Sequence, residues 1–140
     1  MTEPVLLLNE DEVIDRTCNF LQSQGWTIRQ SLHGKTQGID IIAERAGVRL
    51  LVEAKGCTTG TAHDRSLRIQ QHRTNDSVGA VGKLLYLYDG SSMLALALPD
   101  DRVFRAQIEK AKRGLEKLGA AVFWISRDQV RIWNGETLKS

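Results

Sequence analysis

Three side chains with complementary chemistry lie close together in the first half of the chain. Asp40 stands at the start of one apolar run, and Glu53 and Lys55 stand at the end of the next. Neighbouring carboxylates offer the oxygen ligands that hard divalent cations such as Mg²⁺ or Mn²⁺ prefer. An amine beside them stabilises negative charge that develops on a reacting group. The combination predicts a divalent-metal site with a lysine next to it.

A β-hairpin is predicted to position these side chains. Residues 38–56 read GIDIIAERAGVRLLVEAKG, in which two apolar alternating segments flank Ala46 and Gly47. If these two residues form the loop, counting outward sets Asp40 opposite Glu53. A three-residue loop with Gly47 in a bulge shifts the pairing by one. Carboxylates that face each other on a sheet repel, so the predicted pair requires a cation or a proton between them.

The two faces of the predicted hairpin differ in character. Side chains alternate along a strand, so Glu53 and Lys55 point to one face, which they share with Ile42 and Leu51. The opposite face is apolar and consists of Ile39, Ile41, Ala43, Val48, Leu50, Val52 and Ala54. One face therefore belongs to the core, and the other carries the chemistry.

These residues resemble the signature of the PD-(D/E)XK nuclease superfamily. That superfamily has an Asp early in its second strand and Glu-x-Lys in its third, which are matched here by Gly-Ile-Asp ending at Asp40 and by Glu53-Ala54-Lys55. The later segments are similar to uncharacterised bacterial members and to the Mrr and archaeal Holliday-junction-resolvase branches. The resemblance implies an α/β fold, a restriction-endonuclease-like mixed β-sheet flanked by helices, in a single nuclease-like domain over residues 1–140.

The same resemblance implies a metal-dependent nuclease that hydrolyses phosphodiester bonds of DNA. Asp40 and Glu53 would hold Mg²⁺ or Mn²⁺, and the backbone carbonyl of Ala54 would be a further ligand. Lys55 would orient the attacking water or stabilise charge on the phosphate. A homodimer is expected from the resemblance alone, because nuclease relatives often dimerise to cut two strands.

The first helix departs from the superfamily pattern. The additional Glu that the superfamily often places there would fall close to Ile14, so the match fails at this position. The accessory candidates are the neighbouring acids Glu10, Asp11 and Asp15. Acids in a first turn also favour the helix dipole without any further role, and both interpretations stay open.

Glutamine and basic residues complete the set of candidates. Gln70 and Gln71 lie where several branches carry a Gln that positions the metal or the phosphate, and Lys83 stands where another Gln is expected. Residues 57–74 are basic and lack Phe, Tyr and Trp, which suits phosphate contacts more than base stacking. Phosphate binding and an ordinary solvated surface both remain open for this segment. The candidate nucleic-acid-binding residues are Lys35, Arg65, Arg68, Arg73 and Lys83.

Composition places the chain among ordinary globular proteins. Its 140 residues are 41% hydrophobic and 26% charged, and the net charge of +2 permits nucleic-acid binding without demanding it. The apolar run near the start is too short for a signal peptide or a membrane span, so a cytoplasmic protein without membrane contact is expected. Cys18 and Cys57 provide no disulfide framework and are expected to be free thiols.

Local signals predict the elements around the site. Asn9 and Glu12 fit a capping box that opens a helix, and Gly25 is placed to end it. A 4-3-4-3 apolar spacing predicts a helix over residues 101–118 that Gly119 ends. The other predicted elements are a strand over 26–30, a short helix over 75–82, a hairpin of strands 84–88 and 93–98 around an Asp-Gly turn, and strands over 121–126 and 130–133.

Two further interpretations compete with the nuclease. A non-catalytic nucleic-acid-binding or assembly module that retains the nuclease-like fold would explain the missing glutamate on the first helix and the weak net charge. Alternatively, Glu53 and Lys55 form a surface ion pair of little energy, and Asp40 is a solvated strand residue. The separation of the Asp40 and Glu53 carboxylates distinguishes this last interpretation from the other two.

Overall fold

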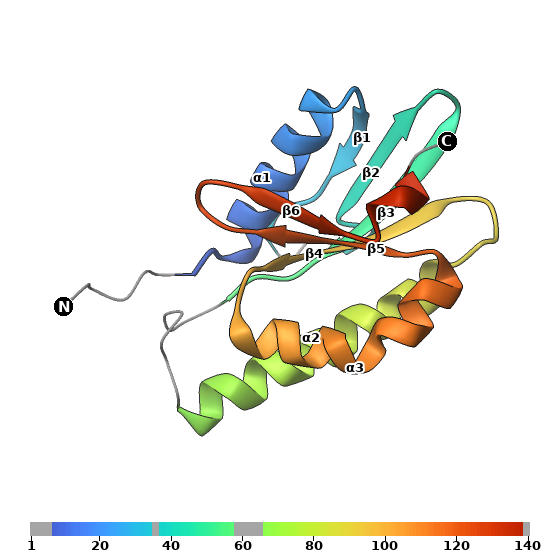
Figure 1. Ribbon diagram of the computed structural model, residues 1–140. Coiled ribbons are helices and arrows are strands. Elements are labelled where there is room, and N and C mark those ends of the chain that lie inside the picture. Colours follow the sequence, from blue (N-terminus) through green and yellow to red (C-terminus); the bar gives the residue numbers. More distant parts are fainter. Residues whose placement is uncertain (1–6, 35–36, 58–65, 139–140) are drawn as a thin grey trace.

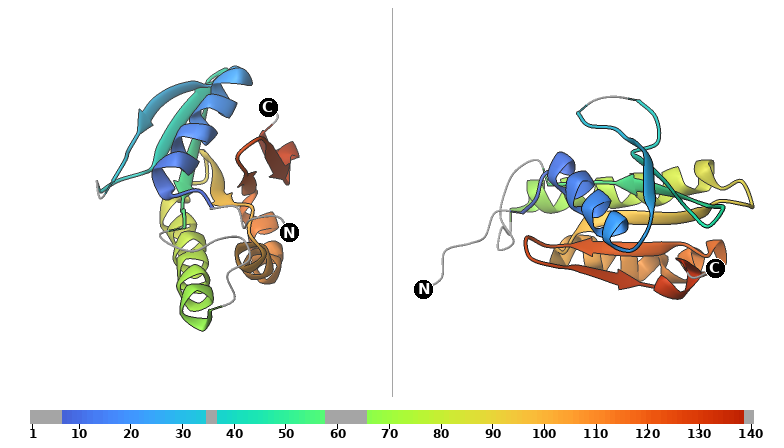
Figure 2. Two further views of the ribbon diagram at one scale, coloured as in Figure 1. Left: turned by 90° about the vertical axis from the view of Figure 1, so that its left-hand side faces the viewer. Right: turned by 90° about the horizontal axis from the view of Figure 1, so that it is seen from above.

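The protein forms a six-stranded sheet with helices on both faces, as the computed structural model shows for the residues that it describes, 7–34, 37–57 and 66–138 (Figure 1). Helix α1 covers one face, and α2 and α3 lie side by side on the other (Figure 2). The predicted class, a mixed α/β sheet flanked by helices, is confirmed.

In chain order the elements are α1 Glu10–Ser23, β1 Thr27–Ser31, β2 Ile41–Arg45, β3 Val48–Ala54, α2 Leu67–Leu87, β4 Met93–Pro99, α3 Arg102–Leu118, β5 Ala121–Ile125, β6 Val130–Trp133 and the 3₁₀ helix η1 Gly135–Leu138.

The sheet is mixed because its strands are connected in two ways. The first three strands are antiparallel neighbours, and β5 and β6 form a further antiparallel pair. In contrast, β3, β4 and β5 run parallel, and α2 and α3 are the crossovers between them. Parallel neighbours require such a crossover. The crossover from β3 to β4 therefore brings α2 onto the sheet face next to the end of β3.

Each face of the sheet has its own apolar core, and β4 contributes to both. Its alanines Ala95 and Ala97 face α1, whereas Leu94, Leu96 and Leu98 face α2 and α3. This alternation follows from the period of two along a strand. The larger side chains fill the layer under the two helices, and the smaller ones let the single helix α1 approach closely.

The predicted capping box of α1 and the predicted end of α3 at Gly119 are confirmed. Asn9 and Glu12 form the reciprocal capping box, with N to O distances of 2.8 and 3.1 Å. Asp101 caps α3 by accepting from the amides of Val103 and Phe104, and Gly119 ends α3 with a φ of 70°. Both helices therefore begin and end where local side-chain chemistry places them.

The region between β3 and β4 differs from the sequence prediction. The short helix predicted over 75–82 is part of the much longer α2, and the predicted strand over 84–88 is helical up to Leu87. Ser77, Ala80 and Leu84 continue one buried stripe along α2, so residues after Gly82 pack against the sheet as a helix. The strand from Met93 pairs with β3 in parallel and not with a hairpin partner.

Two strand positions also differ from the prediction. The first strand begins at Thr27, one residue later than predicted, and the buried Trp26 ring before it lies beneath the Arg45 guanidinium, which is 4.4 Å from the ring centroid. Ile39 packs in the core under α2 and α3 and not with Ile41 on the α1 side. The regular pairing of β2 begins only at Ile41, so the alternation does not extend back to Ile39.

Cys18 and Cys57 are free, as predicted, and burial raises the pKa of each thiol to about 11. Neither thiol is therefore prepared to act as a nucleophile at neutral pH. Among the described residues, no helix has both the length and the apolar character that crossing a bilayer would require.

Candidate active site

The hairpin of β2 and β3 has the predicted register. Ala46 and Gly47 form the two-residue loop, both with positive φ values, 52° and 79°. Arg45 pairs with Val48, and the regular ladder ends with Ile41 opposite Val52. Continuing this register by one residue places Asp40 opposite Glu53, which decides against the three-residue alternative.

The Asp40 carboxylate lies across the end of the hairpin. Its Oδ2 accepts a hydrogen bond from the backbone N–H of Ala54 at 2.9 Å. This bond fixes one carboxylate oxygen at the end of β3, and a side-chain hydrogen bond joins the Asp40 carboxylate to Glu53. The interpretation of Asp40 as a solvated strand residue is therefore wrong.

The Glu53 carboxyl lies in an unfavourable environment for a negative charge. The residue is only 7% exposed, and burial, followed by the neighbouring Asp40 charge, raises its pKa to about 7. The positive charges of Lys55 and Lys83 partly offset this rise in pKa. The Lys55 Nζ lies 3.9 Å from Glu53 Oε1. A divalent cation bound between Asp40 and Glu53 would stabilise the charged forms of both carboxylates.

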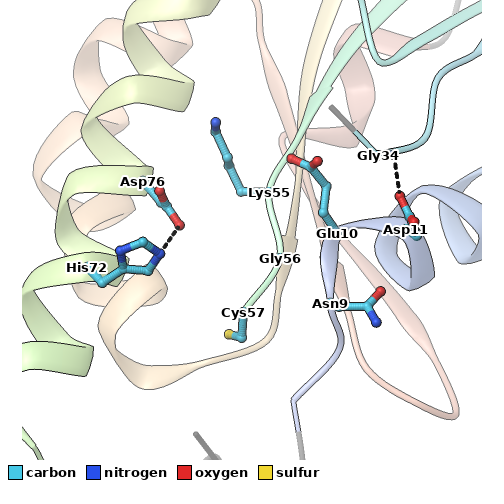
Figure 3. Close-up of a pocket in the computed structure, with 9 residues that line it drawn as sticks. All are labelled: Asn9, Glu10, Asp11, Gly34, Lys55, Gly56, Cys57, His72 and Asp76. Atoms are coloured by element: carbon cyan, nitrogen blue, oxygen red, sulfur yellow. Dashed lines mark hydrogen bonds and ion pairs between the residues drawn. The ribbon is translucent and has the colours of Figure 1, made fainter. Parts of the chain in front are cut away.

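A cavity of about 450 Å³ opens beside these residues (Figure 3). Lys55 projects into it from the end of β3, Glu10 and Asp11 line it from the start of α1, and His72 and Asp76 line it from α2. Three elements that are distant in the sequence therefore meet at one polar hollow. The remaining lining residues are Asn9, Gly34, Gly56 and Cys57.

Glu10 is the acid of α1 that joins the site. Burial raises the pKa of Glu10, the Asp40 charge raises it further, and Lys55 opposes the rise. Glu10 therefore lies close enough to Asp40 and Lys55 for their charges to affect its pKa. Ile14, one turn later, is fully buried in the core on the α1 side of the sheet.

A close contact at Gly56 brings Glu10 to the site. A Cβ on Gly56 would lie 2.0 Å from the Glu10 amide nitrogen and 2.2 Å from the Asn9 carbonyl carbon. The amide of Cys57 donates to the Leu8 carbonyl at 2.9 Å. The chain entering α1 is thus held directly against the chain leaving β3, at a distance that only glycine permits.

The other acids of α1 have other partners. Asp11 Oδ1 accepts from the Gly34 amide at 3.0 Å, and Asp15 pairs with His33 at 2.7 Å. Both acids hold the loop after β1 against α1. Asp11 also lines the cavity, whereas Asp15 is not among the residues that line it.

The candidate glutamines lie on the first turns of α2. The Gln71 side chain donates to Asn75 Oδ1 at 2.9 Å, and the Gln70 carbonyl accepts from the Thr74 hydroxyl. The residues of α2 that line the described cavity are instead His72 and Asp76. Neither Gln70 nor Gln71 is among the described residues that line this cavity.

The structure separates the candidate DNA-binding cations. The prediction of Arg73 as a surface contact is wrong, because Arg73 is 2% exposed and its guanidinium is 3.0 Å from the buried Asp101 carboxylate. Arg68 is exposed at the start of α2, and Lys83 acts electrostatically on Glu53. Lys35 and Arg65 lie outside the described residues.

Asp76 was not predicted as a site residue from the sequence, and His72 was considered as part of the basic segment 57–74. His72 Nε2 lies 3.6 Å from Asp76 Oδ2, one turn apart on the side of α2 that faces the cavity. Their i, i+4 spacing was visible in the sequence, but its position became meaningful only once α2 was known to begin at Leu67. Within the described part of the chain, no group of three or more His, Cys, Asp and Glu residues is arranged to hold a metal ion.

Comparison with known proteins gives little beyond the fold. No protein-family model matches the chain, and no curated protein matches it. A crystal structure of an XisH family protein from Nostoc punctiforme is 20% identical, with a TM-score of 0.48 over 86% of this chain and 96% of that one. An fdxN element excision controlling factor protein from Anabaena variabilis is also 20% identical, with a TM-score of 0.42 over 89% and 95%. Likeness at this level establishes no shared activity, so the site must be judged on its own residues.

Proposed function

We propose that this protein is a metal-dependent phosphodiesterase that cleaves DNA. The observation that supports this most is the pairing of Asp40 with the buried Glu53 beside Lys55, at the edge of an open polar cavity. Burying a carboxylate next to another one is unfavourable unless a positive ion compensates. A fold that keeps this arrangement at the rim of a cavity is best explained by a bound cation.

The donor set at this place suits Mg²⁺ or Mn²⁺. Asp40 and Glu53 would hold the ion, with the Ala54 carbonyl and Glu10 as candidate further oxygen donors. Oxygen ligands from two carboxylates with water in the other positions are typical of Mg²⁺, which needs no cluster of three protein side chains. When bound, such an ion polarises a phosphate and lowers the pKa of water.

The remaining residues of the site have roles that follow from their positions. Lys55 extends into the cavity beside Glu53, where an ammonium group would orient water or neutralise charge that develops on the phosphate. Lys83 supplies a second positive charge from α2. The DNA backbone would enter over the cavity mouth between α1 and α2.

The test is cleavage of branched, single-stranded and duplex DNA with Mg²⁺ or Mn²⁺. Asp40→Asn should abolish cleavage and metal binding together. Lys55→Ala should reduce the cleavage rate by about a hundredfold or more but leave metal binding close to wild type, because the ammonium group acts on the reacting phosphate. Lys117→Ala, on the exposed face of α3, is the control and should cut normally. Equal rates for Lys55→Ala and the wild type would contradict the role of Lys55.

A second candidate is a nucleic-acid-binding module without catalytic activity. It is favoured by the finding that the described residues contain no three-residue metal cluster. The same experiment separates the two candidates. Wild-type protein that binds DNA but cuts none of the three substrates with either metal would support the binding module and exclude the nuclease.

A further inference from the structure

The second half of α2 is apolar on the side that faces away from the sheet. Residues 77–88 read SVGAVGKLLYLY, with Lys83 as the sole charged residue, and Lys83 lies on the flank toward the active site. A helix that is apolar all round is normally buried all round. Here only one face is buried inside the chain, by Ser77, Ala80 and Leu84.

Large side chains on the outer face of this segment are exposed. Val78 is 64% exposed, Leu85 62% and Tyr86 89%, and Tyr88 at the C-cap is 54% exposed. These side chains lie on the side of α2 opposite the buried Ser77, Ala80 and Leu84, and α2 itself is an outer element of the fold (Figure 2). From typical side-chain areas, the four residues present on the order of 400 Å² of apolar surface. This is about half of the roughly 800 Å² that each partner buries in a standard interface, so a polar rim would complete it.

Two glycines lie among these side chains. Among the described residues, no atom lies within 4 Å of where a Cβ on Gly79 or Gly82 would be, outside the helix's own backbone. Glycine in the middle of a helix is destabilising relative to alanine. Packing against the described part of the chain requires neither glycine, whereas both would let a second helix approach closely. The face therefore combines projecting side chains with hollows.

We propose that this face of α2 binds the same face of a second copy of the chain, with the two α2 helices antiparallel about a twofold axis near Gly82. The pattern is self-complementary about this residue. On a helix of about 3.6 residues per turn, Val78 and Leu85 lie on one side of the line through Gly82, and Gly79 and Tyr86 lie on the other. A twofold axis perpendicular to two antiparallel helices places residues on one side of this line against residues on the same side of the partner helix. It therefore sets Val78 against the partner's Leu85 and Gly79 against the partner's Tyr86.

A groove beside the helix supports this pairing. A hollow of about 270 Å³ between α2 and α3 is lined on its apolar side by Val78, Val81 and Ala111. It lies on the same side of α2 as Val78, where the partner's Leu85 would enter. Gln107 and Lys110 line it from α3 and provide the polar rim. The exposed side chains and the groove that would receive them therefore lie on the same surface of the protein, as an isologous interface requires.

The proposal does not rest on the nuclease activity, and it is tested by oligomeric state. Sedimentation velocity should find the wild-type chain dimeric at micromolar concentration. Gly82→Leu should raise the dissociation constant by at least about tenfold, because the side chain separates the helices at the axis. Gly114→Leu is the matched control, since Gly114 is an exposed helical glycine on α3 that also has open space at its Cβ. A monomeric wild type, or an unchanged dimer with Gly82→Leu, would overturn the proposal.

A cross-linking experiment tests the register directly. Cysteines at position 82 of two copies would lie at the axis, within the roughly 7 Å Cα separation that a disulfide spans. Mild oxidation should therefore link Gly82→Cys into a covalent dimer, while Gly114→Cys and the wild type, with its native Cys18 and Cys57, should stay largely unlinked. Linking of Gly114→Cys at the same rate as Gly82→Cys would contradict this register. Circular dichroism and thermal unfolding check that each variant is folded.

Discussion

The chemistry of the site depends first on the protonation of Glu53. Its pKa in the folded chain is about 7, above the ordinary value of 4.5, because burial and the Asp40 charge disfavour the anion. Between these two pH values the folded chain binds more protons than the unfolded chain. The free energy of unfolding therefore falls as pH rises through this window, and the loss is complete above about pH 7.

Glu53→Gln should remove this dependence in metal-free protein. We expect the variant to become more stable than the wild type as pH rises from about 4.5 to 8, with the difference growing by about 2 to 3 kcal/mol. Urea unfolding across this pH range in EDTA measures it. Glu116→Gln, an exposed glutamate of α3, should show no such trend. A difference between Glu53→Gln and wild type that stays constant with pH would rule out the raised pKa.

At the scale of elements, the site depends on the contact between α1 and the end of β3. Gly56→Ala would place a methyl group on the backbone of Asn9 and Glu10, so the start of α1 must move away. We expect a loss of about 1 to 3 kcal/mol in stability and a weaker metal affinity, because Glu10 is displaced from the cavity. Chemical unfolding and metal titration give the two quantities. Gly114→Ala should instead be neutral or slightly stabilising, and equal behaviour of the two variants would argue against the contact.

A buried ion pair connects α2 to α3. Arg73 and Asp101 are both 2% exposed, and Asp101 also caps α3. Arg73→Ala leaves the Asp101 carboxylate buried without its cation, so we expect a destabilisation of about 3 to 5 kcal/mol by urea unfolding. Arg105→Ala breaks the exposed pair with Asp100 and should cost less than about 1 kcal/mol. Similar losses for the two variants would show that burial does not strengthen this pair.

The elements that sequence predicted well are those with local signals. The capping box at Asn9, the Ala46-Gly47 turn and the end of α3 at Gly119 each depend on a few adjacent residues, and all were found as expected. The end of α2 was mispredicted because LLYLY is a short apolar run before an Asp-Gly turn signal, and periodicity alone cannot distinguish a buried strand from a buried helix in so short a run. From the sequence, Glu10 was one of three accessory candidates and Asp76 was not a candidate, because the fold alone brings α1 and α2 together at the site.

At the scale of the whole molecule, the net charge of the protein and the charge of the candidate site have opposite signs. The chain is weakly basic, with a net charge of +2, yet the cavity is lined by Glu10, Asp11 and Asp76 next to the signature carboxylates. A DNA phosphate that approaches this cavity without a metal would meet mainly negative charge. Binding of DNA at the site should therefore depend on a divalent ion and not on the overall charge of the protein.

Ca²⁺ offers a measurement of this dependence, because it is a hard cation that takes oxygen ligands. At constant ionic strength, we expect Ca²⁺ to tighten DNA binding by the wild type at least about tenfold relative to EDTA, since it converts a repulsive site into an attractive one. The double variant Asp40→Asn, Glu53→Gln should bind equally with and without Ca²⁺, and more tightly than the wild type in EDTA, because two repelling charges are gone. Fluorescence anisotropy with a labelled duplex measures all four affinities. Equal wild-type affinity in Ca²⁺ and EDTA would mean that DNA does not reach this cavity.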